Sequence, residues 1–83
     1  MLTDYIQAAM HKATYTLLED NTFFGEIPEL AGLWSNAATL EECRDELAER
    51  LEEWLIAGLR LGHPIPVIND IDLNFTFEKE EVA

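Results

Sequence analysis

Residues 23–55 read FFGEIPELAGLWSNAATLEECRDELAERLEEWL, a short aromatic segment followed by a long acidic one. In the aromatic part, Phe23, Gly25 and Ile27 fall on one face of a strand, because successive side chains of a strand point to opposite faces. Pro28 cannot donate a ladder hydrogen bond, so we expect this strand to end there. Gly25 offers no side chain to pack, which predicts that something bulky lies over its face.

A single long helix is predicted after Thr39. Thr39 and Glu42 have the spacing of a capping box, in which each side chain bonds to the backbone amide of the other residue. Apolar residues then recur at steps of three and four over about five turns, which makes a stripe wide enough to cover a small sheet. The stripe consists of Leu40, Cys43, Leu47, Leu51, Trp54, Leu55 and Gly58. Gly62 and Pro64 end the helix.

The remaining segments complete an α+β fold. Residues 3–11 carry apolar side chains at helical spacing and predict a short opening helix. Residues 13–18 are rich in strand-forming residues and, through a turn at 19–22, form a hairpin with the aromatic strand. Residues 33–36 suit a third strand. We therefore predict a three-stranded antiparallel meander packed by one long helix, in a single domain spanning 1–83.

The end of the chain adds a predicted C-terminal strand. Ile71, Leu73, Phe75 and Phe77 alternate with polar residues, as in a half-buried strand. Residues 67–68 either begin this strand or form a separate short one. A strand with one apolar face and a free edge pairs readily with another chain. Leu73, Phe75 and Phe77 are therefore the candidates for self-association.

Composition restricts the classes of partner. The chain has 17 acidic residues against 5 basic ones, a net charge of −12. This balance argues against direct binding of nucleic acid, whose affinity comes largely from Lys and Arg, and against docking on anionic membranes. It favours either simple solubility or a basic protein partner. There is no apolar run near the length of about 20 residues that spans a bilayer and no signal-peptide pattern, so we expect a cytoplasmic protein.

Chain length favours self-association. A chain of 83 residues has a marginal core, since it buries only about 60% of the surface that the unfolded form exposes. The single cysteine, Cys43, excludes an internal disulfide and a Cys-rich zinc site. We therefore expect support from a homo-oligomer, with a twofold dimer as the default.

Enzyme signatures are not found in the sequence. His11 and His63 are far apart, and His63 stands where an imidazole commonly caps the last helical carbonyls. Cys43 lies on the apolar stripe, which favours a buried small hydrophobe over a nucleophile. The carboxylates have no spacing that forces them to converge on a metal. We expect no catalytic residue, no metal and no cofactor.

The helix face opposite the stripe is strongly acidic. Like charges four residues apart on this face repel by about 0.2–0.5 kcal/mol each. Two interpretations stay open, a solvated face and a docking stripe for a basic partner. In the second, the candidate binding residues are Glu46, Glu49 and Glu53. Trp34, just before the helix, either packs under the helix or anchors the same partner.

These segments, in this order, resemble the HicB-like antitoxin family of bacterial toxin–antitoxin systems. The resemblance covers roughly residues 13–60. It rests on the Tyr15 strand, the acidic turn at Asp20, Phe24-Gly25-Glu26-Ile27-Pro28, Leu33-Trp34-Ser35-Asn36 and Thr39-Leu40-Glu41-Glu42-Cys43. Family members usually have a small residue, often Ala, where this chain has Cys43.

The resemblance implies a partial ribonuclease-H-like fold and a non-enzymatic protein that blocks the active site of a small basic HicA-type messenger-RNA-cleaving toxin. Many family members also carry a C-terminal DNA-binding module. Only six residues follow Phe77, so we expect no autorepression by this chain alone. A structural homo-oligomer without a toxin partner is the alternative, and a metal-dependent nuclease, which has only the fold analogy behind it, is the third.

Overall fold

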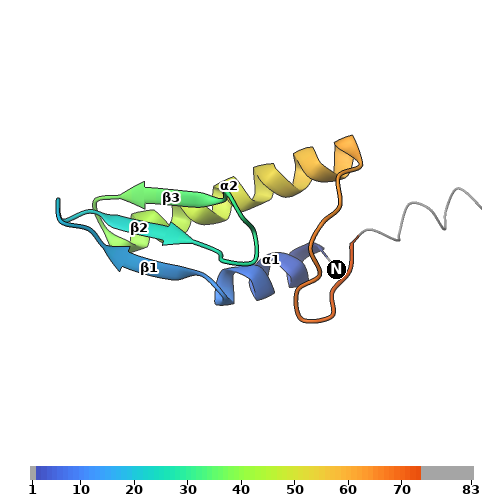
Figure 1. Ribbon diagram of the computed structural model, residues 1–83, viewed down its shortest axis with the longest axis horizontal. Helices are drawn as coiled ribbons and strands as arrows, with labels where there is room; N and C mark the ends of the chain where they lie inside the picture. Colours follow the sequence, from blue (N-terminus) through green and yellow to red (C-terminus); the bar gives the residue numbers. More distant parts are fainter. Residues whose placement is uncertain (1, 74–83) are drawn as a thin grey trace, which may run out of the picture.

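The computed structural model describes residues 2–73 and has an α+β architecture. Its elements in chain order are α1 (Leu2–His11), β1 (Thr14–Leu17), β2 (Phe23–Glu26), β3 (Trp34–Ala37) and α2 (Leu40–Leu61). The strands form one antiparallel sheet in the order β1-β2-β3, and α2 runs along it, while α1 lies beyond the end of the sheet (Figure 1). The predicted meander and long helix are confirmed. The ribonuclease-H-like relationship stays a prediction.

The turn that closes the β1–β2 hairpin is stabilised by hydrogen bonds among its own residues. The amide of Leu18 donates to the Thr22 carbonyl at 2.8 Å, and the amide of Asn21 donates to the Leu18 carbonyl at 3.0 Å. Asn21 has a φ of 65°, which asparagine tolerates in turns. The Asp20 carboxylate accepts bonds from the Thr22 hydroxyl and amide, and these bonds lower the pKa of Asp20. The predicted turn at 19–22 is confirmed.

Gly25 marks the place where α2 rests on the sheet. A Cβ atom at Gly25 would lie 3.0 Å from the Cys43 sulfur, 3.1 Å from the Ser35 hydroxyl and 3.1 Å from the Tyr15 ring. Ser35 is fully buried, and its hydroxyl donates to the Cys43 carbonyl at 2.8 Å. The predicted bulky neighbour over Gly25 is α2 as a whole, whereas the side chain that approaches most closely is the small Cys43. The neighbour that approaches is small, so the helix itself comes close to the strands.

Both ends of α2 are capped at the predicted residues, although the Glu42 carboxylate bonds the Thr39 hydroxyl and not, as predicted, the Thr39 amide. The Thr39 hydroxyl oxygen accepts a bond from the Glu42 amide at 3.1 Å, and the hydroxyl donates to the Glu42 carboxylate at 2.9 Å. At the other end, Gly62 has a φ of 72°, and its amide bonds to the Leu59 carbonyl. Glycine adopts this left-handed conformation without steric cost, which explains why the helix ends here.

The core gathers side chains from every part of the described chain. Its largest fully buried members are Tyr5, Ile27, Leu30, Leu47, Leu51, Leu55, Ile65 and Ile68. One position of the predicted stripe is wrong, because Leu40 is 46% exposed. The buried face of α2 begins one turn later, at Cys43, where the helix first meets Gly25.

Tyr5 fixes α1 to the segment that follows α2. Its side chain is fully buried, and its hydroxyl donates to the Pro66 carbonyl at 2.6 Å. These residues lie 61 positions apart, so this bond joins the two ends of the described chain. Leu2, in contrast, is 42% exposed. The spacing of apolar residues did not predict that Tyr5 is buried and Leu2 exposed. Tyrosine has an apolar ring with a polar hydroxyl at its tip, so its burial depends on whether the hydroxyl finds a partner.

The segment after α2 turns back on itself just before the predicted C-terminal strand, most of which lies outside the described residues. Ile68 and Ile71 form an isolated antiparallel bridge, with backbone bonds of 2.8 and 3.4 Å. Asn69 and Asp70 between them have φ values of 48° and 64°, which reverse the chain in a tight two-residue turn. Residues 67–68 therefore form a separate short piece. Leu73 is buried in the core, and Phe75 and Phe77 lie outside the described residues.

We expect Gly25→Ala to lower the free energy of unfolding by about 1–3 kcal/mol, because the added methyl group meets atoms of the helix and of both neighbouring strands. Urea unfolding followed by circular dichroism measures this change. In a Cys43→Ala background the same substitution should cost less, since the closest atom is gone. An equal cost in both backgrounds would contradict the proposed contact.

Burial raises the pKa of the Tyr5 phenol above its usual value. A raised pKa means that the folded state holds the proton more tightly than the unfolded state does. Its contribution to stability is therefore complete below about pH 10 and is lost as pH rises through the folded-state pKa. We expect Tyr5→Phe to make the free energy of unfolding less dependent on pH between about pH 9 and pH 12.

The same variant should cost about 0.5–1.5 kcal/mol at neutral pH, through loss of the bond to the Pro66 carbonyl. Urea unfolding across this pH range measures both effects. Tyr15→Phe is the matched control, because burial also raises the pKa of Tyr15 but its hydroxyl makes no such bond. An unchanged alkaline slope in Tyr5→Phe would contradict this assignment.

Candidate functional site

The sheet has two unequal faces. The strand register places Tyr15, Gly25 and Ser35 side by side under α2. The next register row places Glu26 beside Trp34, on the opposite face because adjacent residues of a strand point in opposite directions. The side chains on this second face are exposed or half-buried. A partner can therefore reach this face of the sheet.

Trp34 lies on the exposed face and is 47% exposed. Its ring stacks on Phe24, with ring centroids 5.9 Å apart and an interplanar angle of 23°. The Arg50 guanidinium, from α2, lies 5.5 Å from the centre of the Trp34 ring. Of the two interpretations of Trp34, the structure does not show packing under the helix. The indole is held on the surface between an aromatic ring and a cation.

Glu46 joins this group at the outer edge of β3. Its carboxylate lies 3.2 Å from the Arg50 guanidinium and accepts a bond from the Asn36 backbone amide at 3.5 Å. Together these contacts define the Trp34 surface, which consists of Phe24, Trp34, Glu46 and Arg50. An exposed cation–π contact contributes only about 0.5–1 kcal/mol, and an exposed ion pair about 0–1 kcal/mol. The Trp34 surface therefore adds little to folding stability.

The other acidic candidates continue along α2. Glu49 and Glu53 follow Glu46 at steps of three and four, so they lie on the same outward side of the helix. Glu53 borders a shallow hollow of about 440 Å³, two turns beyond Glu46. The structure thus brings Trp34 and Glu46 together, and it places Glu49 and Glu53 progressively farther along the helix.

Sequence reasoning missed two parts of the Trp34 surface, Phe24 and Arg50. The signal for Phe24 was present in the strand alternation, which puts it on the face opposite Gly25. The sequence identifies Arg50 only as a counter-charge for Glu46, four residues earlier on the helix. Its position over the indole depends on where α2 crosses β3, which periodicity does not give.

The self-association candidates are only partly described. Leu73 is 7% exposed and packs in the core of its own chain. Phe75 and Phe77 lie outside the described residues, so their role stays a prediction. The described surface carries other large apolar side chains that are more than half exposed, namely Leu17, Ile56, Leu61 and Val67.

The buried polar groups under α2 form a packing contact. The Cys43 thiol is fully buried and lies 3.3 Å from the Ser35 hydroxyl. The Tyr15 hydroxyl is buried and, within residues 2–73, has no hydrogen-bond partner. Burial raises the pKa of Tyr15, and the nearby Arg44 opposes that effect in part. A substrate cannot reach a fully buried thiol, so this group offers no nucleophile.

Metal clusters and membrane-spanning helices are not found within residues 2–73. His, Cys, Asp and Glu side chains do not gather there in groups of three or more that could hold a metal ion. In the same residues, neither helix has the length and apolar character that a bilayer-spanning segment requires.

Comparison with known proteins gives a family and a solved structure. A family model described as UPF0150-like matches residues 4–66, which include the whole sheet and α2. The crystal structure of TTHA0281 from Thermus thermophilus is similar, with a TM-score of 0.82 and 37% sequence identity. That match covers 87% of this chain and 90% of the other. No curated protein matches the chain significantly.

We expect Trp34→Ala to change the free energy of unfolding by about 1 kcal/mol or less, because Trp34 lies on the surface. Leu51→Ala is the contrasting substitution, since Leu51 is fully buried in α2. It should cost about 2–5 kcal/mol. Urea unfolding of both variants measures the difference. Equal costs would show that Trp34 is a core residue.

Proposed function

The chain belongs to the UPF0150-like family, and we propose that it is a non-enzymatic, antitoxin-type binding protein. Its proposed partner is a small basic HicA-type messenger-RNA-cleaving toxin, whose active site it blocks. The observation that supports this most is the Trp34 surface, an exposed and pre-positioned aromatic group bordered by an acidic helix face.

Charge favours a basic partner. A protein that cleaves RNA must attract a polyanion, so the groove that holds its substrate is rich in Lys and Arg. The chain carries a net charge of −12, and Glu46, Glu49 and Glu53 form an acidic row along the outward side of α2. Carboxylates in such a row can take the places of RNA phosphates in a basic groove. Complementary charge also speeds association, which suits an inhibitor.

Affinity requires an anchor as well as charge. Tryptophan and arginine are the residues that most often dominate the binding energy of protein interfaces. Trp34 and Arg50 are adjacent here, and stacking on Phe24 restricts the indole before any partner binds. A side chain already held in place loses less conformational entropy on binding. The Trp34 surface therefore has the composition and the rigidity of a binding hot spot.

The proposal is tested by RNA cleavage with a purified HicA-type toxin, ideally one encoded beside this chain. We expect the wild-type protein to inhibit cleavage in a one-to-one titration. Trp34→Ala should weaken binding about tenfold or more, because it removes the anchor. Glu49→Lys should also weaken binding, since it reverses one charge of the acidic row.

Glu19→Lys is the matched control for Glu49→Lys. Glu19 is exposed in the turn between β1 and β2, and the substitution changes the net charge by the same amount. It should weaken binding less, because only long-range attraction is reduced. Equal effects of the two charge reversals would argue against α2 as the contact. No inhibition of any HicA-type toxin would reject the proposed function.

A further inference from the structure

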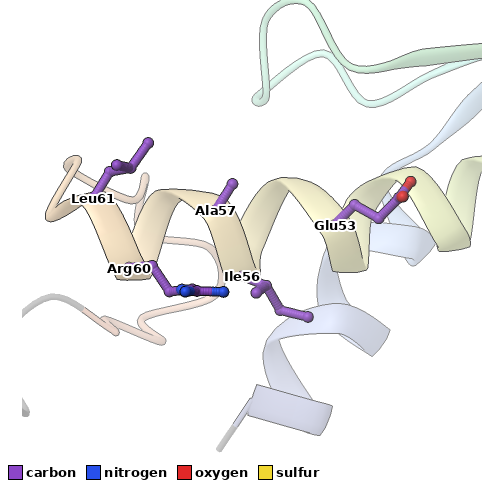
Figure 2. Close-up of a pocket in the computed structure, with 5 residues that line it drawn as sticks. All are labelled: Glu53, Ile56, Ala57, Arg60 and Leu61. Atoms are coloured by element: carbon purple, nitrogen blue, oxygen red, sulfur yellow. The ribbon is translucent and has the colours of Figure 1, made fainter.

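The C-terminal half of α2 carries an apolar surface that does not take part in the core. Ile56 is 53% exposed and Leu61 is 69% exposed, with the small Ala57 between them. Together with Glu53 and Arg60 they line the hollow of about 440 Å³ noted above (Figure 2). Figure 2 shows Ala57 and Leu61 along one side of the helix and Ile56 and Arg60 along the other. We call these five residues the Ala57 face.

The charges of the Ala57 face are arranged symmetrically. Glu53 stands at one end and Arg60 stands two turns away, with Ile56 and Ala57 midway between them. Within residues 2–73, neither Glu53 nor Arg60 has an ion-pair partner. The surface is thus locally neutral on a chain whose net charge is −12.

We propose that the Ala57 face binds a second copy of this chain through an antiparallel pairing of the two α2 helices. The twofold axis passes between Ile56 and Ala57. Rotation about this axis places Glu53 opposite Arg60 of the partner subunit, and Arg60 opposite the partner's Glu53. It also places Ile56 opposite the partner's Ala57. Each charge of the Ala57 face meets its opposite, and the bulky Ile56 meets the small Ala57.

This self-complementary arrangement indicates that the partner on the Ala57 face is a second copy of the chain. In a twofold interface the same patch serves both copies, so every contact must be matched by its own reverse. A patch with one acid and one base equally far from its centre meets this requirement. A uniformly basic partner would meet Glu53 favourably and Arg60 unfavourably. The small Ala57 also allows the helices to approach to about 8–10 Å, the usual distance between packed helices.

Two chains of this charge need the Glu53–Arg60 pairs in order to associate. Two chains of this charge repel each other overall, so chance association through other exposed surfaces is disfavoured. Pairing on the Ala57 face replaces local repulsion by two attractive pairs and covers Ile56 and Leu61. The Trp34 surface lies toward the other end of α2, near β3. The acidic row proposed to bind the toxin shares only Glu53 with the Ala57 face, and dimerisation is measured without toxin, so failure of one proposal can be told from failure of the other.

Charge reversal tests the arrangement. By sedimentation velocity and light scattering we expect the wild type to have twice the 9.5 kDa mass of one chain. Glu53→Arg alone places two arginines opposite each other, and Arg60→Glu alone places two glutamates opposite each other. Each single variant should therefore be monomeric. An equimolar mixture of the two should dimerise again, because every pair across the axis is then of opposite sign.

The variant carrying both Glu53→Arg and Arg60→Glu should also be dimeric, and it keeps the net charge of −12. Glu19→Arg, which changes the charge as much as Glu53→Arg does, should remain dimeric. Circular dichroism confirms that each variant is folded. A monomeric wild type, single variants that stay dimeric, or a mixture of the single variants that stays monomeric would each overturn the proposal.

Discussion

The contact between Gly25 and Cys43 is the constraint on which the rest of this structure depends. A helix packs closely against a sheet only where the facing side chains are small, and here one of them is a hydrogen atom and the other a thiol. The Ser35 hydroxyl stabilises the same contact, because it donates a hydrogen bond to the Cys43 carbonyl. This contact sets the distance of α2 from the sheet and the side that α2 turns toward it. Leu47 and Leu51, one and two turns after Cys43, are therefore buried in the core.

The same contact determines what α2 presents to the outside. Once Cys43 faces the sheet, Glu46 and Arg50 reach the edge of β3, where Arg50 lies over the Trp34 indole. Farther along, Ile56 and Leu61 lie off the side of α2 on which Leu55 and Gly58 are buried, so they remain exposed. One helix thus offers two chemically different surfaces, an aromatic and acidic one beside β3 and an apolar, charge-balanced one toward its C-terminal end. The two proposed partners follow from this division.

Much of the fold could be predicted because it depends on local rules. Alternation and turn residues gave the hairpin, and Thr39 and Gly62 gave the ends of α2, since caps involve residues only a few positions apart. Errors arose where the outcome depends on distant residues. Leu40 fits the apolar stripe but lies before the first contact with the sheet. The predicted strand from Ile71 to Phe77 lies mostly outside the described residues, and the turn at Asn69 and Asp70 decides only that residues 67–68 are separate from it.

Local pattern and charge alone established that this chain is an acidic meander crossed by one capped helix, because periodicity and net charge are properties of neighbouring residues and of composition. Only the packed structure decided which side chains lie in the core and which lie on the surface. Tyr5 is held in the core, where its hydroxyl bonds the Pro66 carbonyl 61 positions away. Trp34 is held on the surface, where its ring contacts the Arg50 guanidinium. Such pairings depend on the position of α2 relative to the strands, and no spacing along the chain encodes that position.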